Sequence, residues 1–317
     1  MRHKTIGLQL CFGLVIIAVT MACSADSERG TEAQNRPLLI SNVTFSSWDG
    51  GDVTRASTTV DAREKEIWVS ANDATPSLYA MSTATETSDP TYNKYVVKQG
   101  NAQEWSGVSA NVYGFFTSSN ANRINSIFTI SDEQDGSTVY DFQASTKSLF
   151  TWSSQNSDGV ILALRQQLAR VNITVEDGDA NTQVQMGNGQ LYCQGMFQYT
   201  APATGAPQFH TSEGYWAFAG DTKTITLNNP TNGNGRSFVA YILPQTVANA
   251  SHFFHVYNTS TGRSSYYALP NANYSLEEGN QYNCTLMQNM YVASIMVDED
   301  FANGTLNNVE TTSESNN

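Results

Sequence analysis

Apolar and polar residues alternate in short runs along most of this chain, and turns rich in Gly, Asn, Asp, Ser and Pro separate the runs. Runs rich in Val, Ile, Thr, Tyr and Phe at this spacing are typical of β-sandwiches rather than of alternating strands and helices. The pattern therefore predicts an all-β protein. The expected strands are residues 38–47, 66–70, 95–98, 111–116, 127–131, 139–143 and 148–152, followed by 191–199, 215–219, 224–227, 238–243, 253–257, 265–269 and 281–286.

The stretch from Val160 to Val175 fits two patterns. Its first part has apolar residues at helical spacing as far as Leu168, whereas its last part alternates strictly, with Ile173 between polar neighbours. We favour one long strand whose parity shifts near residues 166–168, as at a β-bulge. A helical turn that leads into a strand is the alternative.

The strongest break in the middle of the chain follows this stretch, at residues 177–181, which read Asp-Gly-Asp-Ala-Asn. Such clusters of turn residues mark loops between elements. We place a domain boundary there, which gives an N-terminal domain of residues 37–178 and a C-terminal domain of residues 179–303. Residues 304–317 are polar and are expected to form a disordered tail.

The first 22 residues have the organisation of an export signal. Arg2 and Lys4 precede an uncharged apolar run at residues 6–19, and small residues stand before Cys23. A cysteine at the first mature position suggests a bacterial lipoprotein signal, so we expect Cys23 to carry acyl chains. An ordinary signal peptide with an incidental cysteine is the alternative, and the run is too short for a membrane-spanning helix. Residues 23–36 are polar and are expected to form a flexible tether.

The remaining chain is acidic. Residues 1–22 hold two of the 16 Lys and Arg and no acidic residue, which leaves 14 basic against 29 acidic residues and a net charge of −15. This balance argues against nucleic acid and against anionic lipid as partners. Membrane attachment, if it occurs, must therefore come from the acyl chains on Cys23.

Few residues indicate catalytic or metal chemistry. No spacing of Cys and His fits a zinc site, and no acidic cluster has the full calcium loop of an EF-hand. Nucleophile elbows and phosphate-binding loops are also absent from the sequence. Cys193 and Cys284 form either one disulfide or two buried thiols. We therefore expect no enzyme, no cofactor and no metal.

The last apolar segment lies close to the C-terminus. In a strand from Met290 to Val297, alternate positions would share one face. Those positions are Tyr291, Ala293, Ile295 and Val297. The segment either completes its own sheet or is available to the open edge of another subunit.

Several of these segments together resemble the fimbrillins of Bacteroidales, which are subunits of lipoprotein-derived pili. Residues 46–49 (Ser-Ser-Trp-Asp) and 53–56 (Val-Thr-Arg-Ala) look like the family's first strand and the loop after it. Residues 159–175 are similar to its mid-chain strand, although Gln166 and Gln167 stand where a His is frequent. The Leu-Pro-Gln run at residues 243–245 and the Gly-Asn-Gln-Tyr run at 279–282 resemble two later strands.

The resemblance implies two tandem transthyretin-like β-sandwich domains and a route of assembly at the outer membrane. A surface protease would cut after an Arg in the loop that follows the first strand, which we place at Arg55. Loss of the strand at residues 38–47 would open a groove, and the C-terminal strand of another subunit would fill it through the face listed above. Other fimbrial subunits would be the partners, together with ligands on host or bacterial surfaces.

The cut site has two alternatives. Arg63 is a rival cut site, and Arg55 is equally compatible with a solvated side chain without a special role.

Two other functions also fit the sequence. A surface glycan-binding lipoprotein is the main alternative function, with Trp48, Trp105 or Trp216 as a platform for sugar rings. A hydrolase whose site the sequence hides is the third.

Overall fold

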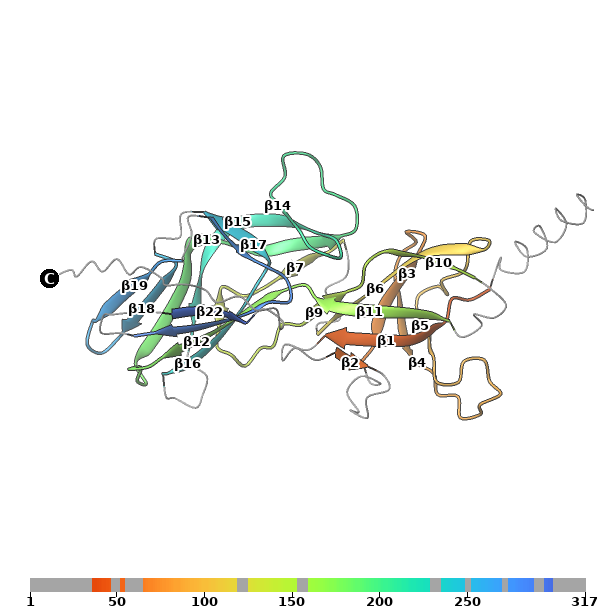
Figure 1. Cartoon of the computed structure of the whole chain (residues 1–317), viewed down its shortest axis with the longest axis horizontal. Helices are drawn as coiled ribbons and strands as arrows, with labels where there is room; N and C mark the ends of the chain where they lie inside the picture. Colours follow the sequence, from red (N-terminus) through yellow and green to blue (C-terminus); the bar gives the residue numbers. More distant parts are fainter. Residues whose placement is uncertain are drawn as a thin grey trace, which may run out of the picture. The chain divides into compact units, whose positions relative to one another are not determined.

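The computed structural model describes residues 36–46, 65–118, 125–152, 159–228, 235–248, 252–269 and 273–287, and the backbone alone of residues 52–54 and 294–298 (Figure 1). Every regular element within these ranges is a β-strand. The all-β prediction is therefore confirmed.

The largest sheet has nine strands. Eight are ordered β10 (Ser148–Thr151), β6 (Ser109–Thr117), β3 (Ile67–Ala71), β4 (Ser77–Met81), β5 (Tyr95–Gln99), β1 (Ile40–Ser46), β11 (Val160–Gln166) and β9 (Phe142–Ala144). The short strand β2 (Asp52–Thr54) pairs with β1, and β6 pairs additionally with β9.

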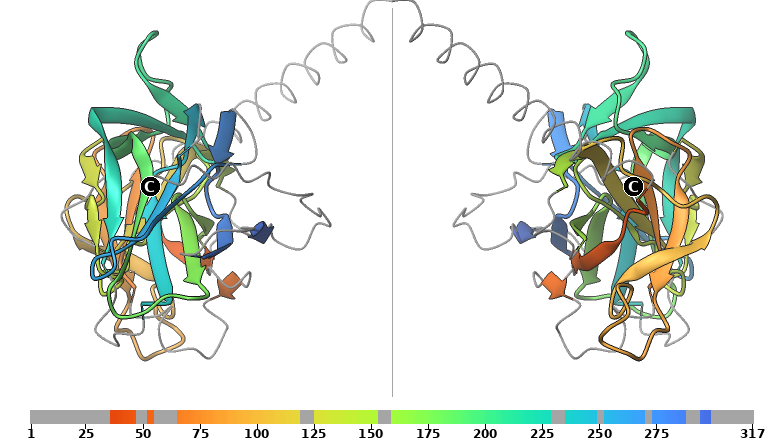
Figure 2. Two further views of the ribbon diagram at one scale, coloured as in Figure 1. Left: turned by 90° about the vertical axis from the view of Figure 1, so that its left-hand side faces the viewer. Right: turned by 90° about the vertical axis from the view of Figure 1, so that its right-hand side faces the viewer.

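Two further sheets form a sandwich (Figures 1 and 2). One is ordered β14 (Gln208–His210), β15 (Tyr215–Leu227), β13 (Thr182–Gln198), β18 (Phe254–Asn258) and β19 (Ser264–Tyr267), with β7 (Ile127–Thr129) on β13 and β8 (Glu133–Gln134) on β15. The other is ordered β16 (Ser237–Ile242), β12 (Ala169–Val175), β21 (Gln281–Leu286) and β22 (Ser294–Asp298). Buried apolar side chains from both sheets form one cluster, so the core lies between them. The strands β17 (Gln245–Ala248) and β20 (Asn273–Leu276) pair separately.

Contacts between Cα atoms divide the chain into two compact units. The first unit comprises Met1–Asn42, Val69–Tyr113 and Ser148–Ile161, and the second comprises Val43–Trp68, Gly114–Lys147 and Leu162–Asn317. Each unit is assembled from segments that are separated in the sequence. The division into tandem domains at residue 178 stays a prediction.

The stretch at residues 160–175 differs from both expected forms. It consists of β11 and β12, which belong to different sheets and are separated by Gln167 and Leu168. The buried positions are even-numbered in β11 and odd-numbered in β12. The change of parity is therefore a crossing between sheets, because each strand turns its apolar side toward a different core.

Six short strands, β2, β4, β8, β14, β17 and β20, were not predicted, and the two strands predicted at residues 215–219 and 224–227 are one strand, β15. The predicted strand at 191–199 is also the second half of a longer one, β13. This strand continues through Gly187, Asn188 and Gly189, which all have positive φ, at a shift of register against β15. The three residues look like a turn in the sequence, but they form an irregularity that bends the strand.

An aromatic cluster fills part of the second unit. The ring of Phe142 is centred 5.3 Å from Trp216, 5.4 Å from Phe128 and 5.4 Å from Phe197. Phe115 stacks on Phe142 at 6.2 Å. Phe142 therefore joins the side chains of several strands that are distant in the sequence.

We predict that Phe142→Ala lowers the free energy of unfolding by about 3–5 kcal/mol, because it removes a large ring from a closely packed cluster. Urea denaturation followed by tryptophan fluorescence measures the change. Leu149→Ala is the control, since this side chain is 65% exposed and its truncation should cost at most about 0.5 kcal/mol. Equal costs for the two variants would contradict the assignment of Phe142 to the core.

Candidate assembly site

The segment that contains the first strand, residues 38–45, is buried at four apolar positions, and the parity of the buried positions changes between Ile40 and Val43. Leu38, Ile40, Val43 and Phe45 are each at most 1% exposed. Burial of a large apolar side chain contributes about 1.5–3 kcal/mol, so the four together contribute roughly 6–12 kcal/mol before the entropy cost of ordering the strand. The segment at residues 38–45 is therefore an integral part of the core rather than an addition to its surface.

Strand β1 lies between β5 and β11 in the sheet (Figure 1). Ile40 pairs with Tyr95 of β5. On the other side, the backbone N–H of Val160 donates to the Leu39 carbonyl at 2.8 Å, and the Ser41 hydroxyl donates to the Val160 carbonyl at 3.2 Å. Loss of β1 would leave β5 and β11 without hydrogen-bond partners along the edges that face β1.

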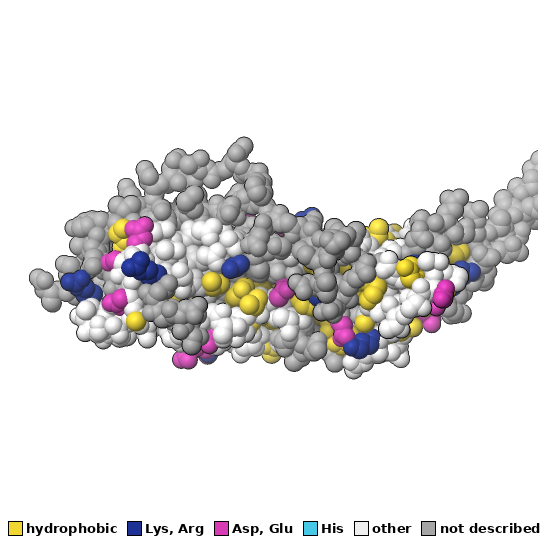
Figure 3. Space-filling model, turned by 90° about the horizontal axis from the view of Figure 1, so that it is seen from below, with side chains coloured by type: hydrophobic (Ala, Val, Ile, Leu, Met, Phe, Trp, Pro, Cys, Tyr) yellow, Lys and Arg dark blue, Asp and Glu magenta, His cyan; other side chains and the backbone are white. Residues whose placement is uncertain are grey.

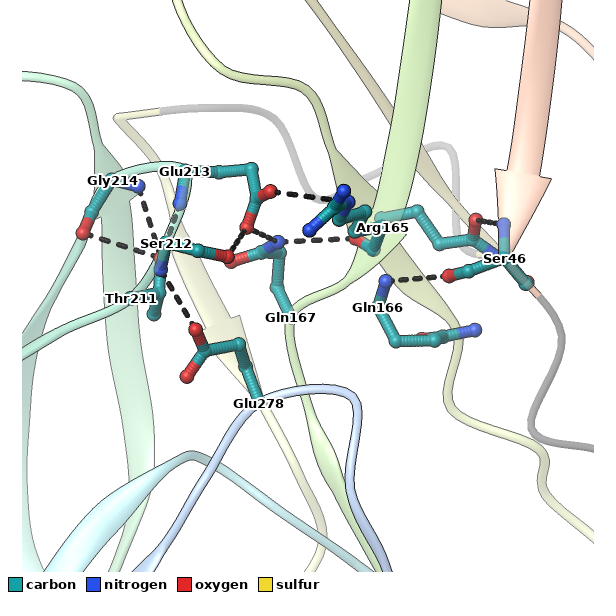
Figure 4. Close-up of polar contacts among 10 residues, drawn as sticks. Ser46, Arg165, Gln166, Gln167, Thr211, Ser212, Glu213, Gly214 and Glu278 are labelled. Carbon is teal, nitrogen blue, oxygen red and sulfur yellow. Dashed lines mark hydrogen bonds and ion pairs between the residues drawn. The ribbon is translucent and has the colours of Figure 1, made fainter. Parts of the chain in front are cut away.

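Polar side chains surround the last residue of β1, Ser46. The amide of Gln143 bonds to the Ser46 backbone twice, as acceptor from its N–H at 3.0 Å and as donor to its carbonyl at 3.1 Å. The backbone N–H of Gln166 donates to the Ser46 hydroxyl at 2.8 Å (Figure 4). The end of β1 is thus bonded through side chains at the point where its regular pairing ends.

Asp141 positions both glutamines. Its Oδ1 accepts from Gln143 at 3.0 Å and from Gln166 at 2.7 Å, while its Oδ2 lies 3.7 Å from the Lys65 ammonium. That ammonium also lies 4.9 Å from the ring centre of Phe45 and is therefore in a cation–π arrangement with β1. Ser46 and Lys65 stand before and after the segment that contains the predicted cut site, so both ends of this segment are bonded to the fold.

The predicted sites of modification and cutting lie outside the described residues. Cys23, Arg55 and Arg63 belong to this group. The backbone of β2, however, pairs with β1 as far as Thr54, which is opposite Thr44. The chain immediately before Arg55 is therefore placed alongside the strand that cutting would separate.

The C-terminal strand pairs with its own chain. Strand β22 lies antiparallel to β21 at one end of the four-stranded sheet, with position 295 opposite Cys284 and position 297 opposite Tyr282. Tyr291 and Ala293 lie outside the described residues. This pairing corresponds to the first of the two expected alternatives, and β22 has β21 as its one neighbour among the described strands.

Cys193 and Cys284 are both free and buried, which corresponds to the thiol alternative rather than the disulfide. Both line the apolar core between the two sheets of the sandwich. Burial disfavours the thiolate and raises the pKa of Cys193 to about 11 and that of Cys284 to about 12. Asp132 raises the pKa of Cys193 further.

The tryptophans do not form an exposed sugar platform among the described residues. Trp216 is fully buried, and its indole N–H donates to the Gln167 carbonyl at 3.0 Å. Trp105 is 8% exposed, and Trp48 lies outside the described residues. The expectation that Trp105 or Trp216 could receive a sugar ring is therefore wrong, because neither offers an open ring face.

A buried carboxylate lies beyond the end of β11 (Figure 4). Glu213 Oε2 accepts from the Gln167 amide at 3.0 Å and from the Ser212 hydroxyl, and Oε1 lies 3.8 Å from Arg165 Nε. The Ser212 backbone N–H donates to Glu278 at 2.7 Å. The arrangement joins the turn before β15 to the crossing between β11 and β12, which is a structural role.

Sequence reasoning did not identify Asp141, Gln143, Lys65 or Glu213. Gln143 was placed in a predicted strand, but its partner Ser46 is 97 residues away. A sequence pattern gives the parity of a strand and not the identity of its distant neighbour. No local signal could therefore have distinguished these residues from ordinary surface polar residues.

The described residues offer little other chemistry. They contain no group of three or more His, Cys, Asp and Glu that could bind a metal ion. The same part of the chain has no helix with the length and apolar character needed to cross a membrane. On the face drawn in Figure 3, Lys and Arg stand apart rather than in a basic patch.

Comparison with known proteins identifies relatives. The sequence model of a family described as fimbrillin-like matches residues 28–299. No curated protein sequence matches significantly. A crystal structure of a candidate cell adhesion protein from Bacteroides uniformis has 12% identity and a TM-score of 0.51, over 83% of this chain and 98% of that one. The tip fimbrial protein Mfa3 from Porphyromonas gingivalis, with a C-terminal truncation, has 9% identity and a TM-score of 0.46, over 83% and 99%.

We predict that iodoacetamide at pH 8 leaves Cys193 and Cys284 unmodified in the native protein and labels both in urea. Their raised pKa values keep the thiols protonated, and burial excludes the reagent. Peptide mass spectrometry reads each site separately. Rapid labelling of the native protein, or a disulfide-linked pair of the two peptides, would contradict this description.

Proposed function

The chain belongs to the fimbrillin-like family, and on that premise we propose that it is a structural or adhesive subunit of a cell-surface fimbrium. The subunit is exported as an outer-membrane lipoprotein, with acyl chains on Cys23. Its acidic composition makes those chains the means of attachment, because few basic residues are available for anionic lipid.

The proposed assembly step is a protease-triggered exchange of strands. Cutting after Arg55 separates β1 from the body, and a strand from another subunit then takes the place of β1. The observation that carries this proposal is the position of β1, which lies between two strands and, together with Leu38 just before it, buries four apolar side chains. An element that is central in the sheet but terminal in the sequence can be removed by a single cut.

The energetics favour replacement over an empty groove. A body without β1 exposes apolar surface, which is unfavourable in water. It also has backbone N–H and C=O groups without partners, which are unfavourable wherever the groove shields them from water. An incoming strand restores both the apolar contacts and the hydrogen bonds. Each subunit added in this way would close the fold of its neighbour without a covalent bond.

The proposed donor is the C-terminal segment, with Tyr291, Ala293, Ile295 and Val297 as the inserting face. Its described part, β22, lies at the end of a sheet, where a strand is bound by one neighbour and is more readily released than a central strand. A stalk subunit needs both the cut and the free donor. An anchor would keep Cys23 and β1, and a tip subunit needs no donor.

We predict that Arg55→Ala abolishes assembly in the producing cell, because β1 remains covalently attached. The measurement is the ladder of high-mass species that resist mild SDS, combined with N-terminal sequencing of the surface protein. The wild type should yield an N-terminus at Ala56, and the variant a blocked N-terminus at Cys23. Arg63→Ala is the matched control and should assemble normally. Loss of the ladder in that variant alone would assign the cut to Arg63 instead of Arg55.

We predict that a chain truncated after Met287 is exported and cut but does not polymerise, because it has no donor strand. The truncation leaves β21 intact, so the sandwich core is retained. Size-exclusion chromatography of the surface material should give a monomer. Ladders of wild-type length from the truncated chain would overturn the assignment of the donor.

A further inference from the structure

The side-chain amides of three buried glutamines form the same pair of hydrogen bonds with a strand backbone that a residue of a neighbouring strand would form. Each accepts from the N–H and donates to the carbonyl of one residue. The pairs are Gln143 with Ser46 (3.0 and 3.1 Å), Gln134 with Tyr241 (2.9 and 3.0 Å) and Gln245 with Tyr192 (2.9 and 3.2 Å). The three glutamines are at most 5% exposed, so these bonds are shielded from water.

Each amide is also fixed locally. The Nε2 of Gln134 donates to the Ser131 carbonyl, and that of Gln245 to the Leu243 carbonyl. Gln143 differs, because its second acceptor is the Asp141 carboxylate at 3.0 Å. Hydrogen bonds to a charged group are stronger than those between neutral groups. The amide of Gln143 is thus the most firmly oriented of the three.

Gln143 also differs in what it binds. Tyr241 and Tyr192 belong to β16 and β13, which stay in the body after the proposed cut. Ser46 is the last residue of β1, the strand that the cut separates. Gln143 itself is on β9, which remains. Among the three pairs, this one alone joins the body to the strand that leaves.

We propose that Gln143 is a positioning residue for strand exchange: it retains β1 in the cut subunit and sets the rate at which β1 is released. The inference rests on the proposed function, since it concerns the same strand. Retention would keep the groove covered until a donor strand arrives, and so would protect the cut subunit from aggregation through exposed apolar surface.

The same amide can receive the incoming strand. Gln143 contacts the backbone of Ser46 and not its side chain, so any residue with an N–H can occupy that position. Proline, which has no N–H, would be excluded. The chain has no proline after Pro270, so its own C-terminal segment meets this requirement along its whole length. The bond between the Gln166 backbone N–H and the Ser46 hydroxyl, in contrast, needs the serine side chain and is therefore specific to β1.

The test measures release of β1 from the purified full chain after cutting with an Arg-specific protease. Excess synthetic peptide of residues 37–47 prevents rebinding, and native mass spectrometry follows the fraction of bodies that keep the N-terminal fragment. Gln143→Met approximately retains the volume of the side chain and removes both hydrogen bonds to the Ser46 backbone. Release of β1 from this variant should be faster than from the wild type by a factor of at least about ten.

Gln134→Met is the matched control, because it removes the same pair of bonds at a strand that does not leave. It should lower the midpoint of urea unfolding without changing the release of β1. If Gln143→Met does not fold, Gln143→Asn replaces it; the amide is kept but is one methylene too short to reach both Ser46 groups, and release should again accelerate.

The outcomes separate two failures. Release at the wild-type rate from the Gln143 variants, or equal acceleration by Gln134→Met, overturns the role of Gln143 and leaves strand exchange intact. If neither the wild type nor any variant releases β1 in the presence of the peptide, the proposed function fails together with the inference.

Discussion

The structure depends on the burial of one terminal strand inside a sheet. Strand β1 has three buried apolar side chains and neighbours on both sides, and Leu38 just before it is buried too, so removal of this segment would leave apolar surface and strand edges uncovered. The strand lies near the start of the described residues, where one cut in the following segment would remove its covalent connection.

Side-chain amides extend the hydrogen bonding of the sheets beyond the strands themselves. At the end of β1, the amide of Gln143 occupies the position of a further strand residue and pairs with the Ser46 backbone. Similar pairs occur at Tyr241 and Tyr192. An uncharged amide suits this role because it has both a donor and an acceptor, and its burial costs less than that of a carboxylate or an ammonium group. The small number of charged residues in the sequence is consistent with such a design.

Local patterning was sufficient for the fold class and for many strands. The bounds predicted for β21, residues 281–286, are those observed, because strict alternation is bounded there by a turn and by the end of the apolar run. At residues 160–175 the change of parity was correctly located, but its meaning was not, since alternation does not reveal that β11 and β12 belong to different sheets. Trp216 was wrongly considered for a surface role, because its burial depends on rings from strands distant in sequence. The bonds of Gln143 depend in the same way on tertiary register.

The central claim is that the body of this protein accepts a foreign strand only when β1 is free to leave. Fluorescence anisotropy with a labelled synthetic peptide of residues 287–300 measures this directly, on the intact chain and on the chain cut after Arg55. The account predicts saturable binding to the cut protein, competed by a peptide of residues 37–47, and no binding to the intact protein. Equal binding to both forms, or none to either, would contradict it.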